Sequence, residues 1–325
     1  MVPMHVLNIP VSPVPPFRLD LTALALRRRP TNAIDTWNGE IYSRVLALDN
    51  IPVLVQVAQS AGTRSPRLHI KAQAKRMPRN ARARILESLE RLLGLRVDLR
   101  PFYRFAKADR RLSALAQRFI GVKPPRFPTV FEAIVNGIAC QQLSLHVGLT
   151  LLNRLAARAG LPFQTSDGER YAFPRSQEVS ECTMRVLRLL GFSTNKGTAL
   201  RQIAGEIIAG QFNPEALRSL RNEEAIEHLL ALRGVGRWTA EYVLLRGLGR
   251  TDVFPADDVG ARNNLVRWLK VEGTLDYGSV NRRLARWQPY SGLIYFHLLL
   301  DSLETPPLAS KQLSNESLVD QEHRK

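Results

Sequence analysis

Short runs that alternate apolar and polar residues fill the first third of the chain and predict an antiparallel β-sheet. The pair Asn38-Gly39 is a strong hairpin-turn signal, and a second turn precedes the next strand-like run. A helix follows, with Asn80 at its N-cap and Gly94 after its last residue. A small sheet with a helix or two on one face is the simplest assembly. The predicted elements are strands over 41–48, 53–59 and 67–71 and a helix over 80–93.

From about residue 101 the apolar spacing becomes helical only. Thr129 and Glu132 have the spacing of a capping box, which predicts that a helix begins after the proline-rich residues 124–128. The stretch 162–176 is polar and predicts a long loop. Further helices are predicted over 181–190, 196–209, 222–232, 238–248, 259–269 and 292–300.

These patterns predict an α+β fold with two domains, since 325 residues exceed one average domain. A mixed α/β domain is expected over 17–110 and an all-α domain over 111–304. Residues 1–16 are expected to be an N-terminal extension. Periodicity is lost after about residue 304, which predicts a disordered tail over 305–325.

The charge balance of the chain indicates what kind of partner it binds. The chain has 46 Lys and Arg against 29 Asp and Glu, a net charge of +17, which favours a polyanion such as nucleic acid. Cys140 and Cys182 are too few for a zinc or iron–sulfur site, and they indicate buried thiols in a reducing setting. No apolar run of about 18 residues and no signal-peptide pattern is present, so no membrane partner is expected.

A glycine hairpin between two predicted helices is the first candidate for chemistry. Only Arg233-Gly234-Val235-Gly236 separates the helices, and the glycines permit positive φ and close approach of a phosphate. The second helix would direct its free N–H groups at that phosphate. Such a contact binds DNA without reading its sequence. An ordinary turn between helices, with glycine after the first helix, is the alternative.

The second candidate is Asp258, twenty residues after Trp238 and directly before a predicted helix. Either Asp257 or Asp258 could supply the N-cap of that helix. A carboxylate at a helix start is stabilised in its charged form. Next to a dry aromatic pocket it could therefore stabilise a developing cation.

Together these segments resemble the helix-hairpin-helix DNA glycosylase superfamily, and within it the bacterial 3-methyladenine DNA glycosylase II (AlkA-type) branch. The resemblance is carried by LRGVGRWTAEY over 232–242 and DVFPADD over 252–258, with further likeness over 131–144 and 286–297. It implies a TATA-binding-protein-like N-terminal sheet domain followed by an all-α helix-hairpin-helix glycosylase domain.

The resemblance also implies an activity, excision of alkylated purines such as 3-methyladenine and 7-methylguanine in base excision repair. The damaged nucleotide would be flipped out of the duplex and its N-glycosidic bond hydrolysed. Asp258 falls on the catalytic aspartate, which stabilises an oxocarbenium-like sugar and directs water, and Asp257 would then be the pure cap. Trp238 stands where bifunctional relatives carry a lysine nucleophile, so a monofunctional enzyme without lyase activity is expected.

The remaining site residues are also assigned by resemblance. Trp238 and Tyr242 would line the base pocket and attract a cationic purine through their ring faces. Leu299 and Val259 occupy two pocket positions where the family often has aromatic residues. The wedge that fills the duplex would be Gln142 or Leu143, with Gln142 favoured. The hairpin contacts to the DNA backbone would come from Arg233, Gly234, Val235, Gly236 and Arg237.

No cofactor and no metal bound by side chains is expected, although a monovalent cation held by main-chain carbonyls of the hairpin is common in the family. The expected partner is double-stranded DNA that contains damaged bases, bound by a monomer in the cytoplasm and nucleoid of a bacterium. Two alternatives remain open: a glycosylase for deaminated or oxidised bases, and a non-catalytic helix-hairpin-helix DNA-binding protein. Trp238 counts against an oxidised-base lyase, and Asp258 counts against the non-catalytic protein.

Overall fold

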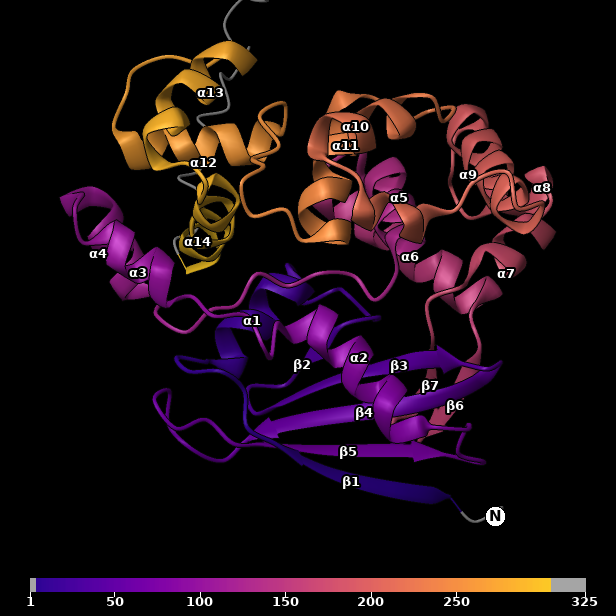
Figure 1. The fold of residues 1–325 in the computed structure, drawn as a ribbon. Coiled ribbons are helices and arrows are strands. Elements are labelled where there is room, and N and C mark those ends of the chain that lie inside the picture. The colour runs from indigo at the N-terminus through magenta and orange to yellow at the C-terminus, as the bar shows by residue number, and fades with distance from the viewer. Residues whose placement is uncertain (1–3, 305–325) are drawn as a thin grey trace, which may run out of the picture.

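The computed structural model describes residues 4–304 (Figure 1). Its N-terminal part is a five-stranded antiparallel sheet with the strand order β1-β5-β4-β3-β2. Two helices, α1 and α2, lie on one face, between the sheet and the helical part of the molecule. The elements are β1 (His5–Val11), α1 (Leu19–Arg27), β2 (Thr36–Trp37), β3 (Ile41–Leu48), β4 (Ile51–Gln59), β5 (Leu68–Ala74) and α2 (Ala81–Leu93).

The alternation of side chains along β4 explains how the sheet packs. Val53, Val55 and Val57 point into the core shared with α1 and α2, because successive strand residues face opposite sides. Leu54 points to the other side and contacts a small cluster with Phe163. The predicted strands and the helix ended by Gly94, in the left-handed conformation, are confirmed.

Two sequence predictions are wrong here. Residues 5–11 are not an extension, because His5–Val11 pairs along its whole length with β5. This edge strand buries only Ile9 and contains a proline, so its pattern lacked the alternation that marks a strand. Likewise, the predicted loop over 162–176 contains a hairpin, β6 (Pro162–Thr165) and β7 (Gly168–Tyr171), that packs against the outer face of the sheet.

The remaining helices form two lobes with separate cores. In the first lobe α5 lies at the centre, with ten of its eleven residues buried. The lobe consists of α5 (Val130–Cys140), α6 (Leu145–Ala159), α7 (Ser176–Glu181), α8 (Met184–Leu189), α9 (Thr194–Ile208), the 3-10 turn η1 (Pro214–Ser219), α10 (Asn222–Leu230) and α11 (Arg237–Val243), which continues as the π-helical turn η2 (Leu244–Leu248).

The second lobe combines helices that are far apart in sequence. Helix α3 belongs to this core, although the predicted boundary at residue 110 assigned it to the N-terminal domain. The lobe consists of α3 (Arg100–Ala106), α4 (Arg110–Arg118), α12 (Val259–Leu269), α13 (Tyr277–Leu284), the 3-10 turn η3 (Ala285–Trp287) and α14 (Ser291–Glu304). The segment after η2 crosses from the first lobe to the second, so α11 and the start of α12 face each other across the junction (Figure 1).

The predictions made for α5, α9, α10, α11 with η2, α12 and α14 are confirmed, with shifts of a few residues at their ends. The helix expected over 181–190 begins later, as α8, because Thr183 is its N-cap. Helices α3, α4, α6, α7 and α13 were not predicted as separate elements. The disordered tail expected over 305–325 lies outside the described residues. Within residues 4–304, no helix is long and apolar enough to cross a membrane.

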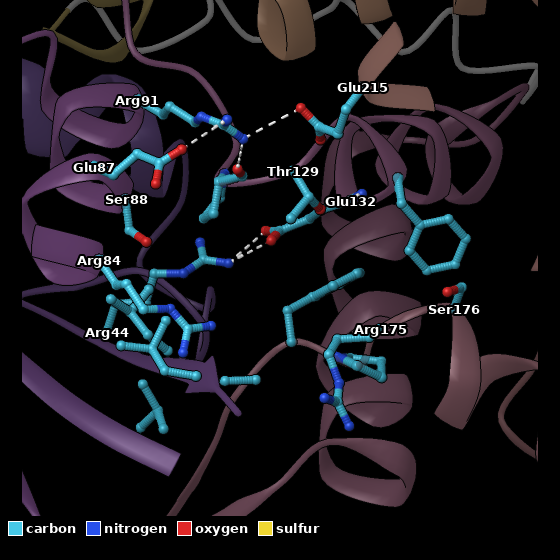
Figure 2. A pocket seen from close by; sticks show the side chains of 18 of the residues that line it. Arg44, Arg84, Glu87, Ser88, Arg91, Thr129, Glu132, Arg175, Ser176 and Glu215 are labelled. Carbon is cyan, nitrogen blue, oxygen red and sulfur yellow. Dashed lines mark hydrogen bonds and ion pairs between the residues drawn. The ribbon is translucent and has the colours of Figure 1, made fainter. Parts of the chain in front are cut away.

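An ion-pair cluster joins the sheet to the helical part. Arg44 on β3 donates to both carboxylate oxygens of Glu132 on α5, at 2.5 and 2.7 Å, and to Asp35 at 2.8 Å. All three side chains are buried, and the Arg44–Glu132 contact lies at the edge of a cavity of about 350 Å³ (Figure 2). The capping box is therefore only half formed: Thr129 caps α5, but the Glu132 carboxylate pairs with Arg44 across the junction.

Candidate functional site

The carboxylate of Asp258 lies at the junction of the two lobes, where one group from each lobe holds it. As the N-cap of α12, it accepts a hydrogen bond through Oδ1 from the backbone N–H of Ala261 at 2.8 Å. Its Oδ2 accepts from the indole N–H of Trp238 on α11 at 3.3 Å. Asp258 is half-buried, so it is oriented by the protein and still open to a ligand.

The assignment of Asp257 as the pure cap is wrong. Asp257 accepts a hydrogen bond from Nε of Arg237 at 2.7 Å, and it does not cap α12. The Arg237 guanidinium also lies over the ring of Tyr277, 3.8 Å from its centroid. The cap and the predicted catalytic carboxylate are therefore the same residue, Asp258.

Trp238 and Tyr242, which we call the aromatic wall, stack one helical turn apart on α11. Their ring centroids are 5.5 Å apart with 28° between the planes. Trp238 is half-buried, whereas Tyr242 is only 4% exposed, so Trp238 presents the accessible part of the wall. Burial raises the pKa of the Tyr242 hydroxyl. This hydroxyl accepts a hydrogen bond from Nη1 of Arg28, at the C-cap of α1, at 3.2 Å.

The other two predicted pocket residues differ in exposure. Val259 directly follows Asp258 and is 60% exposed, so this side of the site is open. Leu299 is half-buried on α14 and packs against the second-lobe core. Sequence reasoning missed Tyr295, one turn earlier on α14. Tyr295 packs edge-on against Phe254, which lies in the segment that leads to Asp258. Burial and, to a smaller extent, the charges of Asp258 and Tyr242 raise the pKa of Tyr295.

The hairpin before α11 has one buried anchor and an open edge. Val235 is 7% exposed and packs into the first-lobe core, so it holds the hairpin in place. Gly234 has a φ of +78°, and a Cβ there would lie 2.7 Å from the Cβ of Ala199. Gly236 is the N-cap of α11, with extended backbone and open space around its Cα. Arg233 is exposed. The free N–H groups of the first turn of α11 are thus not covered by a side chain at Gly236.

The turn between α5 and α6 carries both wedge candidates. Gln142 is exposed with a φ of +54°, and Leu143 is 42% exposed. The choice between them stays a prediction. Gln141 fixes the turn to the hairpin, because its amide donates to the carbonyl of Gly234 at 2.8 Å and to Oγ1 of Thr239 at 2.7 Å.

Lys196 on α9 holds the same turn from the other side. Its Nζ donates to the carbonyl oxygens of Ala139 and Gln141, at 3.0 and 2.7 Å. These are the last carbonyls of α5, where a cation is favoured by the helix dipole. Sequence reasoning missed Gln141 and Lys196, since only the fold brings α9, the turn and the hairpin together.

Two kinds of group are considered as ligands for a cation: acidic, histidine and cysteine side chains, and the main-chain carbonyls of the hairpin. Within residues 4–304, no group of three or more His, Cys, Asp or Glu side chains could hold a metal ion. At the hairpin, the carbonyl of Gly234 already accepts from Gln141, and the carbonyl of Leu232 accepts from the N–H of Val235 at 3.2 Å. Each carbonyl keeps one lone pair. A monovalent cation at these carbonyls stays a prediction.

Comparison with known proteins shows which proteins this chain is similar to. Residues 135–289 match the model of the HhH-GPD superfamily base excision DNA repair proteins. The chain is 28% identical to the DNA-3-methyladenine glycosylase of Bacillus subtilis, covering 80% of this chain and 87% of that protein. It is 24% identical to DNA-3-methyladenine glycosylase 2 of Escherichia coli, covering 87% and 94%. The solved 3-methyladenine DNA-glycosylase from Archaeoglobus fulgidus superimposes with a TM-score of 0.77 at 28% identity, covering 90% of this chain and 97% of that one.

Proposed function

We propose that the chain is a monofunctional DNA glycosylase for alkylated purines such as 3-methyladenine and 7-methylguanine. The proposal starts from the match of residues 135–289 to the model of the HhH-GPD superfamily of base excision DNA repair proteins. The observation that carries the proposal is the Asp258 carboxylate, held at the start of α12 by the indole of Trp238. The relatives named DNA-3-methyladenine glycosylase span nearly the whole chain, which supports alkylated purines as the substrate class.

The proposed reaction hydrolyses the bond between C1′ and the base nitrogen. The damaged nucleotide rotates out of the duplex, and its base lies against Trp238. The bond breaks with both electrons leaving on the base, so positive charge develops on the sugar, where the Asp258 carboxylate stabilises it. Water then forms a bond to C1′ and gives its proton to the carboxylate, which passes it to solvent. A base and an abasic site result.

The absence of lyase chemistry is proposed from the side chain at position 238. Strand cleavage in bifunctional relatives requires an amine that attacks C1′ to form a Schiff base, and an indole cannot do this. Lys196, the lysine bound at the neighbouring turn, has its Nζ directed at two main-chain carbonyls. Neither residue is placed to form a covalent intermediate.

Contact with DNA is proposed to come from the hairpin and the wedge turn. The exposed edge at Gly236 leaves room for a phosphate at the start of α11. Gln141 fixes the hairpin to the turn with Gln142 and Leu143, so backbone binding and wedge insertion would occur at a fixed spacing. The net charge of +17 favours such a polyanionic partner.

The first test replaces Asp258 by Asn in purified protein incubated with methylated DNA. Asn can still cap α12, so folding and DNA binding should persist, whereas base release should fall roughly 100-fold or more. Asp276→Asn is the matched control, because Asp276 caps α13 in the same way by accepting from Ser279 at 2.7 Å. Full activity of Asp258→Asn would refute the assignment, and no base release by the wild type would leave a non-catalytic DNA-binding protein.

The lyase prediction is tested in the same reaction mixture. We expect abasic sites without strand breaks, and no covalent protein–DNA complex after borohydride treatment. A trapped complex would show that an amine of the protein attacks C1′ and that the enzyme is bifunctional.

A further inference from the structure

Two arginine side chains are buried behind the aromatic wall. Arg28 is 7% exposed, and it donates to the hydroxyl of Tyr242 at 3.2 Å and to Oδ1 of Asn136 at 3.0 Å. Arg246 is 1% exposed, and its guanidinium carbon lies 5.2 Å from the ring centroid of Phe127 and 5.3 Å from that of Phe296. Neither residue was identified from the sequence as part of the site.

The two guanidinium groups keep unused donors and lack a direct anionic partner. Nε of Arg28 and both Nε and Nη2 of Arg246 make no hydrogen bond with the described part of the chain. In residues 4–304 neither arginine forms an ion pair; the buried carboxylates of Asp35 and Glu132 pair with Arg44 instead. A buried guanidinium without an anionic partner destabilises the folded protein, which indicates that it has a functional role.

Arg28 and Asp258 contact different members of the aromatic wall. Arg28 contacts the hydroxyl end of Tyr242, which stacks on Trp238, and Trp238 donates to Asp258. Burial raises the pKa of Tyr242 and of Tyr295; the charge of Asp258 raises both further, whereas the charges of Arg28 and Arg246 lower both. The site thus has a negative group near the sugar position and positive groups at its other end.

This arrangement of charges favours cleavage of the glycosidic bond in one class of lesion. A cationic base such as 7-methylguanine accepts the two bonding electrons and leaves as a neutral molecule. A neutral base such as hypoxanthine accepts the same electrons and leaves as an anion, which then takes a proton from water. A fixed positive charge on the base side stabilises the transition state only for the second class, and it slightly repels the first.

We propose that Arg28 is a specificity-determining residue that allows the site to excise neutral purine lesions in addition to cationic alkylated ones. The inference rests on the proposed glycosylase function. Arg28 is chosen over Arg246 because Arg246 also donates to the carbonyl of Ala25 and is enclosed by two phenylalanines, so its removal would disturb the core. Arg28 comes from the N-terminal domain, which therefore takes part in substrate choice.

The test compares single-turnover release of hypoxanthine and of 7-methylguanine from duplexes of otherwise identical sequence. In Arg28→Gln, which keeps polar atoms but removes the charge, hypoxanthine release should fall about tenfold more than 7-methylguanine release. Arg28→Lys keeps the charge and should retain the wild-type ratio of the two rates. The matched control is Arg29→Gln, because Arg29 is the exposed neighbour and should leave the ratio unchanged.

The outcomes separate this inference from the proposed function. If the wild type releases neither base, the glycosylase proposal fails and the inference fails with it. If it releases 7-methylguanine but no hypoxanthine, the glycosylase proposal stands and the inference is overturned. An equal loss of both rates in Arg28→Gln, with melting curves that show a folded protein, would mean a structural role only. If Arg28→Lys lowers the ratio of hypoxanthine release to 7-methylguanine release as much as Arg28→Gln does, the inference is also overturned.

Discussion

Asp258 combines a structural role and a proposed chemical role in one side chain. From the sequence, the helix cap was assigned to Asp257 and the reactive carboxylate to Asp258. The structure assigns one oxygen of Asp258 to the N–H of Ala261 and the other to the indole of Trp238. Both contacts use N–H donors, so they fix the direction of the carboxylate and leave lone pairs for water or the sugar.

The bond from Trp238 predicts a measurable effect at the residue scale. Trp238→Phe keeps an aromatic ring against Tyr242 but removes the donor to Asp258. A hydrogen bond to a charged group contributes about 1.5–3 kcal/mol, so the single-turnover rate of base release should fall roughly 10- to 100-fold. The same substitution at Trp268, which packs on Trp287 in the second lobe, is the control and should leave the rate nearly unchanged. Equal rates for Trp238→Phe and wild type would mean that this bond does not orient the carboxylate.

At the scale of the element, the two glycines of the hairpin have different roles. Gly234 is required by the fold, because its φ is positive and its Cα faces Ala199 on α9. Gly236 has ordinary extended backbone, and a Cβ added there would meet no other atom within 4 Å, so the fold does not require glycine. A requirement for glycine at 236 would therefore come from the ligand that approaches it.

This difference gives a paired prediction. Gly234→Ala should lower the free energy of unfolding by about 1–3 kcal/mol, because alanine strains the left-handed backbone. Gly236→Ala should change it by less than about 0.5 kcal/mol but should weaken binding to duplex DNA about tenfold if a phosphate bonds there. Urea unfolding and a fluorescence-anisotropy titration at fixed salt measure the two quantities. Unchanged DNA affinity of Gly236→Ala would show that the phosphate does not contact this edge.

For the whole molecule, the buried cluster of Arg44 with Asp35 and Glu132 ties the sheet to the helical part. Arg28 crosses the same junction to reach Tyr242 and Asn136. The N-terminal domain is thus connected to the first-lobe core through buried charged groups, and its position relative to the helices determines where Arg28 lies. Figure 2 shows the Arg44 guanidinium directed at the Glu132 carboxylate across this junction.

Loss of Arg44 should therefore destabilise the protein strongly. Arg44→Met leaves two buried carboxylates without their partner, and breaking such a buried pair costs about 3–5 kcal/mol. Thermal melts and urea unfolding should show this loss. Arg100→Met is the control, because Arg100 pairs with Asp98 on the surface and its removal should have little effect. A similar change for both variants would mean that the buried cluster contributes no more than a surface ion pair.

Sequence alone determined the features that depend on neighbouring residues. The bounds 259–269 predicted for one helix agree with α12, and the turn at Asn38-Gly39 joins two strands, because caps, turns and periodicity act over a few residues. The spacing of the hairpin, Trp238 and Asp258 was likewise readable as a motif. The roles of these individual residues in catalysis and in DNA contact stay predictions.

The tertiary structure decided what depends on residues distant in the chain. Strand β1 is recognisable only through its pairing with β5, since an edge strand with one buried residue carries almost no pattern of its own. Arg28 and Tyr242 are 214 positions apart, and nothing local to either predicts their hydrogen bond. The motif therefore specified the carboxylate and the hairpin. The charge of Arg28 behind the aromatic wall depends on how the N-terminal domain packs on the helices, and so does the preference among lesions that we propose from it.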